Sequence, residues 1–135
     1  MQKKVLIAEF LGTLLLVFFG CGAIVFDTLF GGDLGHAGIS IVFGLVVMAV
    51  IYSFGNVSGA HINPAVTIAL CFAGRFETRL MPGYILMQVM GATSAALLLR
   101  WTFSETEILG LTLPNIDLLE AFFVEIVISF ALMSV

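Results

Sequence analysis

The side chains best suited to chemistry lie in a polar run between two apolar stretches, residues 56–63. The run leads into Asn63-Pro64-Ala65, which is typical of a helix start, because Asn is a favoured N-cap and Pro is favoured at the first helical position. We expect the Asn63 side-chain oxygen to accept from the N–H of Val66 or Thr67, so that its two N–H donors point away from the helix. The helix dipole adds about half a positive charge there. Such a site suits the oxygen of a water or an alcohol and opposes a cation.

The residues before Asn63 supply hydrogen-bond acceptors. Gly59 and Ala60 carry little side-chain bulk, so the carbonyl oxygens of Gly59, Ala60 and His61 can be exposed along a narrow path. A donor site next to a row of acceptors describes a conduit for small neutral molecules that carry hydroxyl groups.

Other polar or reactive side chains give weaker signals. Glu9 and Gln88 interrupt apolar stretches, where polar groups are usually functional or paired, and we expect both to act as hydrogen-bonding anchors. His61 has no second ligand at metal-binding spacing, and Cys21 and Cys71 have no Cys-x-x-Cys pattern. We therefore expect no metal, no cofactor, no disulfide and no catalytic residue. A membrane-embedded enzyme or redox protein is the rival interpretation, but it lacks a paired carboxylate or a nucleophile with its base.

Composition places the chain in a bilayer. Its 135 residues are 61% hydrophobic and 10% charged, with a mean hydropathy of +1.18, against about 25% charged residues in ordinary soluble domains. This excludes a soluble globular protein and a disordered one. Five Lys and Arg against nine Asp and Glu exclude nucleic-acid binding.

The elements that position the polar run are apolar helices. A span needs about 20 mostly apolar residues, and we expect four spans, at residues 5–26, 38–54, 82–101 and 118–135. Between the second and third spans, a helix over residues 64–74 is only about 15 Å long, roughly half of the hydrocarbon core. We expect it to enter and leave on the same face.

Charges support this topology. Lys3 and Lys4 place the amino terminus in the cytoplasm, and a re-entrant half-helix keeps Arg75 and Arg79 there too. Non-helical backbone at membrane depth is tolerated only where it is buried in protein or lines a water-filled cavity, so the polar run predicts a cavity or pore. An ordinary cytoplasmic loop that never enters the membrane is the alternative.

Three segments stand in an order that resembles a known family. Residues 58–67, Ser-Gly-Ala-His-Ile-Asn-Pro-Ala-Val-Thr, look like the first signature loop of the major intrinsic proteins, the aquaporins and glycerol facilitators. Residues 8–13, Ala-Glu-Phe-Leu-Gly-Thr, resemble the opening of that family's first helix, and residues 88–92, Gln-Val-Met-Gly-Ala, its third. The resemblance implies an all-α, polytopic membrane protein with an aquaporin-like helix bundle and a re-entrant half-helix.

The resemblance also implies roles for individual residues. Asn63 would be one of two pore asparagines, and the carbonyls of Gly59, Ala60 and His61 would line the cytoplasmic half of the pore. Phe43 would stand at the outer constriction, where an aromatic residue of this type favours water. Glu9 and Gln88 would hydrogen-bond the backbone of the re-entrant loop. The implied function is passive conduction of water and small neutral solutes such as glycerol, excluding ions and protons, in a homotetramer in the cell membrane.

The family is built from two inverted repeats. We expect residues 1–135 to form a single membrane domain, with residues 1–103 as the first repeat and residues 117–135 as the first span of a second. Glu125 would be the counterpart of Glu9. We expect the chain to be a fragment of a protein about twice as long. The alternative is a truncated, non-conducting membrane subunit that assembles with intact channel chains.

Overall fold

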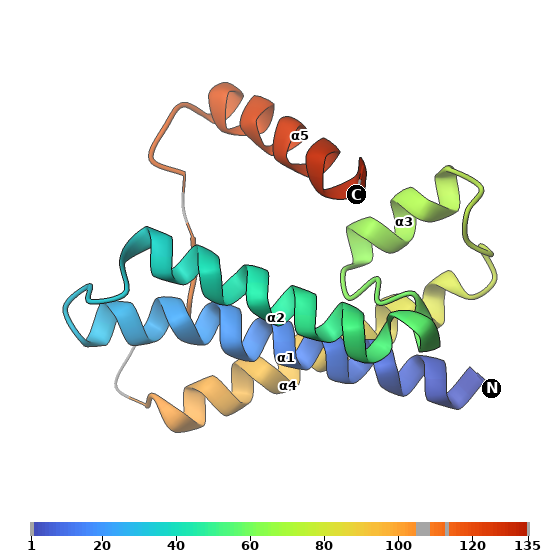
Figure 1. Ribbon diagram of the computed structural model, residues 1–135, viewed down its shortest axis with the longest axis horizontal. Coiled ribbons are helices and arrows are strands. Elements are labelled where there is room, and N and C mark those ends of the chain that lie inside the picture. Colours follow the sequence, from blue (N-terminus) through green and yellow to red (C-terminus); the bar gives the residue numbers. More distant parts are fainter. Residues whose placement is uncertain (1, 105–108, 113, 135) are drawn as a thin grey trace.

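The computed structural model describes residues 2–104, 109–112 and 114–134. Within these ranges the chain is helical and has no strand, which confirms the all-α class (Figure 1). The five helices of the described residues are α1 (Gln2–Leu29), α2 (Gly35–Ser58), α3 (Pro64–Phe72), α4 (Met81–Thr102) and α5 (Leu118–Ser134).

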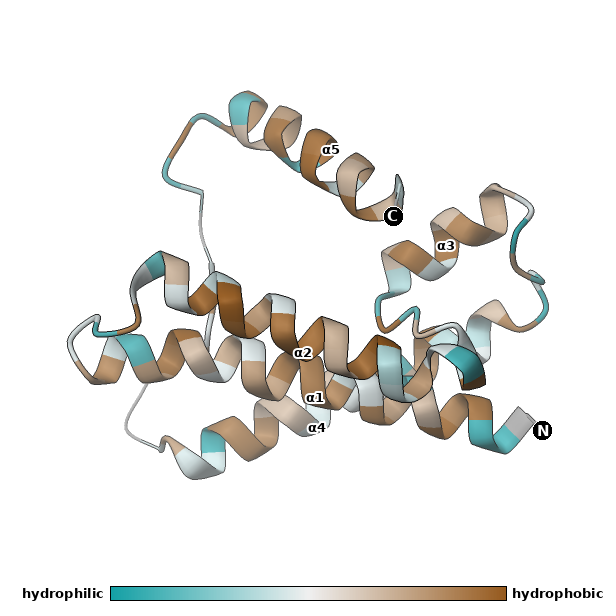
Figure 2. Ribbon diagram, viewed as in Figure 1, coloured by the Kyte–Doolittle hydropathy of each residue, from teal (hydrophilic) through white to brown (hydrophobic). Residues whose placement is uncertain are grey.

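Three of these helices are long and apolar enough to cross a membrane: α1, α2 and α4. They have 28, 24 and 22 residues, or about 42, 36 and 33 Å at 1.5 Å per residue, against a hydrocarbon core of about 30 Å. Figure 2 shows hydrophobic residues along most of their length. Helices α1 and α2 extend three or four residues beyond each end of the expected spans, and α4 extends one residue beyond each end.

Helix α1 lies between α2 and α4 and contacts both (Figure 1). Glycines make the closest approaches possible. A Cβ on Gly91 of α4 would lie 2.4 Å from the carbonyl oxygen of Phe10 in α1, and a Cβ on Gly20 of α1 would lie 2.3 Å from the ring of Phe43 in α2. Small residues at such crossings let membrane helices pack backbone against backbone.

The segment between α2 and α4 folds back beside the bundle. Helix α2 continues to Ser58, so the first residues of the expected loop are helical, and it ends at Gly59, whose φ of 87° is left-handed. Helix α3 has nine residues and contacts α4. It is therefore about 13 Å long, too short to cross. A small apolar core of Val50, Ala60 and Ile62 joins this loop to α2.

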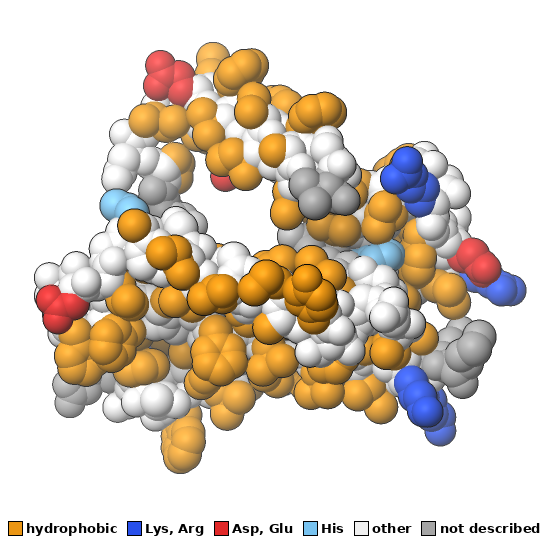
Figure 3. Space-filling view, in the orientation of Figure 1, with side chains coloured by type: hydrophobic (Ala, Val, Ile, Leu, Met, Phe, Trp, Pro, Cys, Tyr) orange, Lys and Arg blue, Asp and Glu red, His pale blue; other side chains and the backbone are white. Residues whose placement is uncertain are grey.

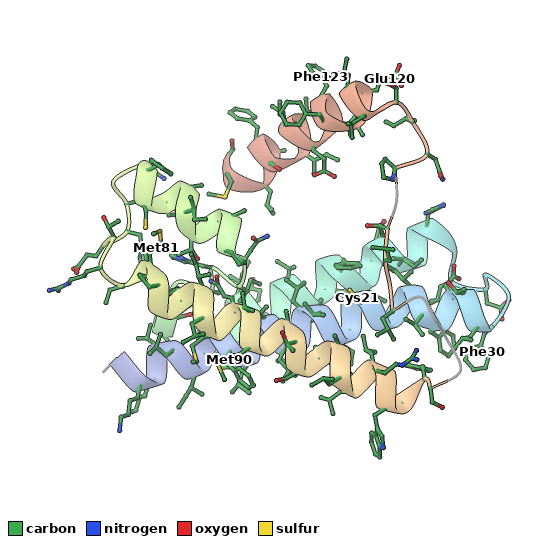
Figure 4. All side chains as sticks on the ribbon, turned by 180° about the vertical axis from the view of Figure 1, so that it is seen from behind. Cys21, Phe30, Met81, Met90, Glu120 and Phe123 are labelled. Carbon is green, nitrogen blue, oxygen red and sulfur yellow. The ribbon has the colours of Figure 1, made fainter. Side chains whose placement is uncertain are left out.

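Helix α5 stands apart from the other helices (Figure 1). It spans Leu118–Ser134 and buries none of its residues. Figure 4, drawn from behind, shows Glu120 and Phe123 on its outer side. Its 17 residues would extend about 25 Å, at the lower limit for a span.

Candidate functional site

The site is organised around Glu9, which is fully buried in α1. Its Oε1 accepts from the Ser58 hydroxyl at 2.6 Å and from the His61 N–H at 3.0 Å. Its Oε2 accepts from the Ile62 N–H at 2.8 Å and from the Gln88 side-chain nitrogen at 2.7 Å. A buried carboxylate is costly unless its oxygens are satisfied, and here four donors converge on it. Glu9 thereby ties α1 to α2, to the loop and to α4.

The loop that Glu9 holds has an unusual backbone. Gly59, Ala60 and Ile62 all have positive φ angles, of 87°, 47° and 44°. This region is easy for glycine but strained for a side chain with a Cβ, and most of all for a β-branched residue such as Ile. Side chains accept hydrogen bonds from the backbone N–H groups of this strained segment. The Ala60 N–H donates to the Ser58 Oγ at 3.1 Å, and the N–H groups of His61 and Ile62 donate to the Glu9 carboxylate.

Thr67 of α3 and Gln88 of α4 form a second, equally buried junction. The Gln88 side-chain nitrogen donates to both Glu9 and the Thr67 Oγ1, the latter at 2.9 Å. The Thr67 hydroxyl donates to the Asn63 carbonyl oxygen at 3.1 Å. With its only hydrogen used there, Thr67 Oγ1 can only accept from the Nδ1 of His61 at 3.2 Å. That arrangement places the proton of a neutral His61 ring on Nδ1.

The ring of His61 in the loop packs against two further rings, Phe76 between α3 and α4 and Tyr84 on α4. His61 lies 4.6 Å from Phe76 and 4.9 Å from Tyr84 between ring centroids, and Phe76 lies 4.6 Å from Tyr84. The Tyr84 hydroxyl donates to the Ser58 carbonyl oxygen at 2.7 Å. Since Tyr84 and Gln88 are four residues apart on one helix, they present the same face of α4 to the loop.

Asn63 caps α3. Its backbone is extended, Pro64 occupies the first turn, and the side-chain oxygen accepts from the Ala65 N–H at 2.8 Å. The acceptor is thus satisfied by Ala65 and not by the expected Val66 or Thr67. The amide nitrogen of Asn63 has no partner among the residues that the structure describes, and the side chain is exposed.

A cavity of about 180 Å³ lies beside this cap. On one side it is lined by Ala60, His61 and Asn63 of the loop and the cap, and on the other side by apolar residues of α1, α2 and α5. Within the described part of the chain, the carbonyl oxygens of residues 59–61 accept no hydrogen bond. The full lining is Leu16, Val47, Ile51, Ala60, His61, Ile62, Asn63, Val66, Leu132 and Met133.

Two further residues named from the sequence stand apart from this cavity, and the roles expected for them stay predictions. Phe43 of α2 packs against Gly20 of α1. Glu125 is exposed on α5 and, among the described residues, has no hydrogen-bonding partner. Gln88 reaches Glu9 and Thr67 through side chains, whereas a bond to the loop backbone was expected.

Sequence reasoning did not single out the roles of Ser58, Thr67 and Tyr84. The first two stand inside the quoted signature segment, and Tyr84 stands one helical turn before Gln88, so spacing alone could have nominated them. No group of three or more His, Cys, Asp or Glu that could hold a metal occurs within the described residues. Both cysteines are free.

Comparison with known proteins decides the family. The profile described as "Major intrinsic protein" matches residues 1–135. The chain belongs to the major intrinsic protein family. It is a multi-pass membrane protein, as its three long apolar helices indicate.

Similar members of this family carry aquaporin names. The chain is 43% identical over 138 residues to "Aquaporin NIP1-2" of Arabidopsis thaliana, covering 96% of this chain and 47% of that protein. It is 44% identical over 144 residues to "Aquaporin NIP1-2" of Oryza sativa subsp. japonica, covering 100% of this chain and 47% of that protein. It is 45% identical over 131 residues to "Putative aquaporin NIP4-1" of Arabidopsis thaliana, covering 96% of this chain and 46% of that protein. The chain thus spans about half the length of these relatives.

Proposed function

We propose that this chain forms part of the wall of a transmembrane channel for water and small neutral solutes such as glycerol, which excludes ions and protons. The observation that carries the proposal is the position of Asn63. Its amide nitrogen is free of partners within the described chain, at the start of α3 and beside the cavity that Ala60 and His61 also line. The aquaporin names of the relatives agree with it.

The chemistry of the site suits a neutral permeant. A water or alcohol oxygen would accept from the Asn63 amide, and its hydroxyl hydrogens would reach the open carbonyls of residues 59–61. The positive end of α3 opposes a cation at the same place. Positive half-helix ends that exclude protons and cations are a general feature of aquaporin-type pores. No step makes or breaks a covalent bond, so the proposal involves no catalysis, cofactor or metal.

Orientation, repeats and assembly belong to the same proposal. Lys3, Lys4, Arg75 and Arg79 favour a cytoplasmic amino terminus, in the cell membrane. Residues 1–103 would be a first inverted repeat and residues 117–135 the start of a second, with Glu125 in the place that Glu9 has in the first. Phe43 would stand at an outer constriction, and the assembled channel would be a homotetramer by family resemblance.

Osmotic shrinkage of proteoliposomes tests the proposal. Vesicles containing the complete channel protein, of which this chain would form part of the wall, should shrink faster than empty vesicles after an osmotic step. In Asn63→Asp the new carboxylate still caps α3, because Asp is as good an N-cap as Asn. The substitution replaces the amide N–H donors by an anion. We expect a severalfold lower water rate and a cation leak. The same change in Asn56→Asp, an exposed position outside the cavity lining, should alter neither.

Two results would contradict the proposal. Equal shrinkage of loaded and empty vesicles, with insertion verified, would refute conduction. Co-purification of a larger channel subunit would then favour the non-conducting assembly subunit. An unchanged water rate in Asn63→Asp without a cation leak would remove Asn63 from the permeation path.

A further inference from the structure

Basic side chains gather at one end of the molecule, which we call the basic end: Lys3, Lys4, Arg75 and Arg79. These are four of the five Lys and Arg of the chain, and all four are exposed. Figure 3 shows Lys and Arg side chains at this end. Glu77, which stands between Arg75 and Arg79 in the sequence, pairs with Arg79. The basic end therefore carries a net positive charge within a chain whose formal net charge is −4.

A cavity opens at the basic end between α1 and the start of α4. Its volume is about 450 Å³, against about 180 Å³ for the cavity beside Asn63. Figure 4 locates this end by Met81, the first residue of α4. Part of the lining is charged and the rest is mostly apolar. The lining residues are Val5, Leu6, Glu77, Arg79, Leu80, Gly83 and Tyr84.

The apolar part of this cavity has a structural cause. Gly83 has no side chain to fill the space, and a Cβ there would lie 3.3 Å from the Leu6 methyl group. The Tyr84 hydroxyl is already bound to the Ser58 carbonyl, so Tyr84 offers the cavity its ring. Val5 and Leu80 complete an apolar floor. Such a floor accommodates hydrocarbon and gives a small hydrophilic anion nothing to bind.

Arg79 supplies donors at the charged rim. Its Nε donates to the Glu77 carboxylate at 2.6 Å. An arginine has five N–H donors in a planar fork, and the four on its terminal nitrogens have no partner among the described residues. Its side chain is 81% exposed. A guanidinium with open donors binds phosphate oxygens in pairs, and Lys3 and Lys4, which directly precede Val5, add to the positive potential.

We propose that this cavity binds one diacyl phospholipid with an anionic headgroup. The phosphate lies at the Arg79 rim, and an acyl chain lies on the floor formed by Val5, Leu6, Leu80 and Gly83. Anionic lipids are attracted to basic clusters at helix ends, and pockets of this composition between helices bind such headgroups. The site is separate from the Asn63 cavity and does not depend on conduction.

Native mass spectrometry of the detergent-solubilised protein tests the site. We expect one phosphatidylglycerol to bind each chain more tightly than phosphatidylcholine with the same acyl chains. Arg79→Gln should weaken phosphatidylglycerol binding about tenfold, as expected for loss of charge-assisted hydrogen bonds, and weaken phosphatidylcholine binding less, because the choline ammonium already neutralises the phosphate of that lipid. Glu77→Gln should strengthen phosphatidylglycerol binding, because it frees the Arg79 Nε and removes the opposing charge. Both side chains are exposed, so neither change threatens folding.

A control variant distinguishes binding at a specific site from attraction by the overall charge of the protein. Arg100→Gln removes the same charge at the opposite end of α4 and should leave phosphatidylglycerol affinity unchanged. An equal loss in Arg79→Gln and Arg100→Gln would overturn the proposal, since net charge alone would then explain it. Equal affinity for the two lipids would do the same and would leave the basic end as a signal of membrane orientation only. Competition by glycerol phosphate, which has no acyl chains, would show a free-phosphate site and contradict the lipid assignment.

Discussion

Glu9→Gln is the sharpest perturbation of the site, because it keeps the size of the side chain and removes its charge and one acceptor. The native carboxylate receives four donors, two on each oxygen. With the new amide nitrogen at the position of Oε1, the His61 N–H loses its acceptor. With the nitrogen at the position of Oε2, the Ile62 N–H loses its acceptor. In either orientation at least one buried backbone donor is left unpaired.

The free-energy change follows from these losses. An unpaired buried donor costs about 1–3 kcal/mol, and the bonds that remain lose the strengthening that a charged acceptor gives. Removing a buried charge also relieves part of its desolvation penalty. We expect a net loss of about 2–4 kcal/mol in the stability of the loop.

Hydrogen exchange measures this loss where it arises. A tenfold change in an equilibrium corresponds to about 1.4 kcal/mol, so amides in residues 59–62 should exchange at least tenfold faster in Glu9→Gln. The thermal midpoint should fall as well. Glu125→Gln is the matched control, because Glu125 is exposed and has no hydrogen-bonding partner among the described residues. Unchanged exchange in residues 59–62, or a raised thermal midpoint, would refute the reasoning.

Two further substitutions test the packing and the second anchor of the loop. Gly91→Ala places a Cβ 2.4 Å from the Phe10 carbonyl oxygen and should destabilise the packing of α1 against α4 by about 1–3 kcal/mol. The control is Gly44→Ala, which has no atom within 4 Å of its Cβ and should be neutral or slightly stabilising. Thermal unfolding in detergent compares the two variants. Tyr84→Phe removes the 2.7 Å bond to the Ser58 carbonyl and should cost about 1 kcal/mol, read as faster exchange in residues 59–62. Equal midpoints for the two alanine variants, or unchanged exchange in Tyr84→Phe, would contradict these assignments.

Much of the helical architecture follows from the sequence because hydrocarbon thickness imposes a length on each element. The three long spans and the short α3 lie where apolar runs of about 20 and about 10 residues predict them. Their ends were less predictable. Helix α2 runs to Ser58, through residues whose polarity suggests a loop, because the left-handed Gly59 and not the polarity of the sequence stops it.

The site was predictable only as far as its motifs reach. Glu9, Gln88 and Asn63 could be nominated from residue type and position. The three hydrogen bonds of the Thr67 hydroxyl, to His61, Asn63 and Gln88, could not be predicted, because they depend on how α3 packs against α4. The placement of Phe43 against Gly20 likewise follows from the crossing of α1 and α2, a tertiary contact that the local sequence does not specify.

The strain in the loop explains why a carboxylate occupies position 9. Ala60 and Ile62 are held in left-handed conformations that cost of order 1–3 kcal/mol each, and neighbouring N–H groups in such a turn cannot join a helix. A carboxylate accepts at both oxygens and donates at neither, so it can take the N–H groups of His61 and Ile62 together with two side-chain donors. The backbone of Asn63 is therefore positioned from α1 and α4, through Glu9, Gln88 and Thr67, while the hydrogen bond from the Ala65 N–H at the start of α3 fixes the direction of its side-chain amide.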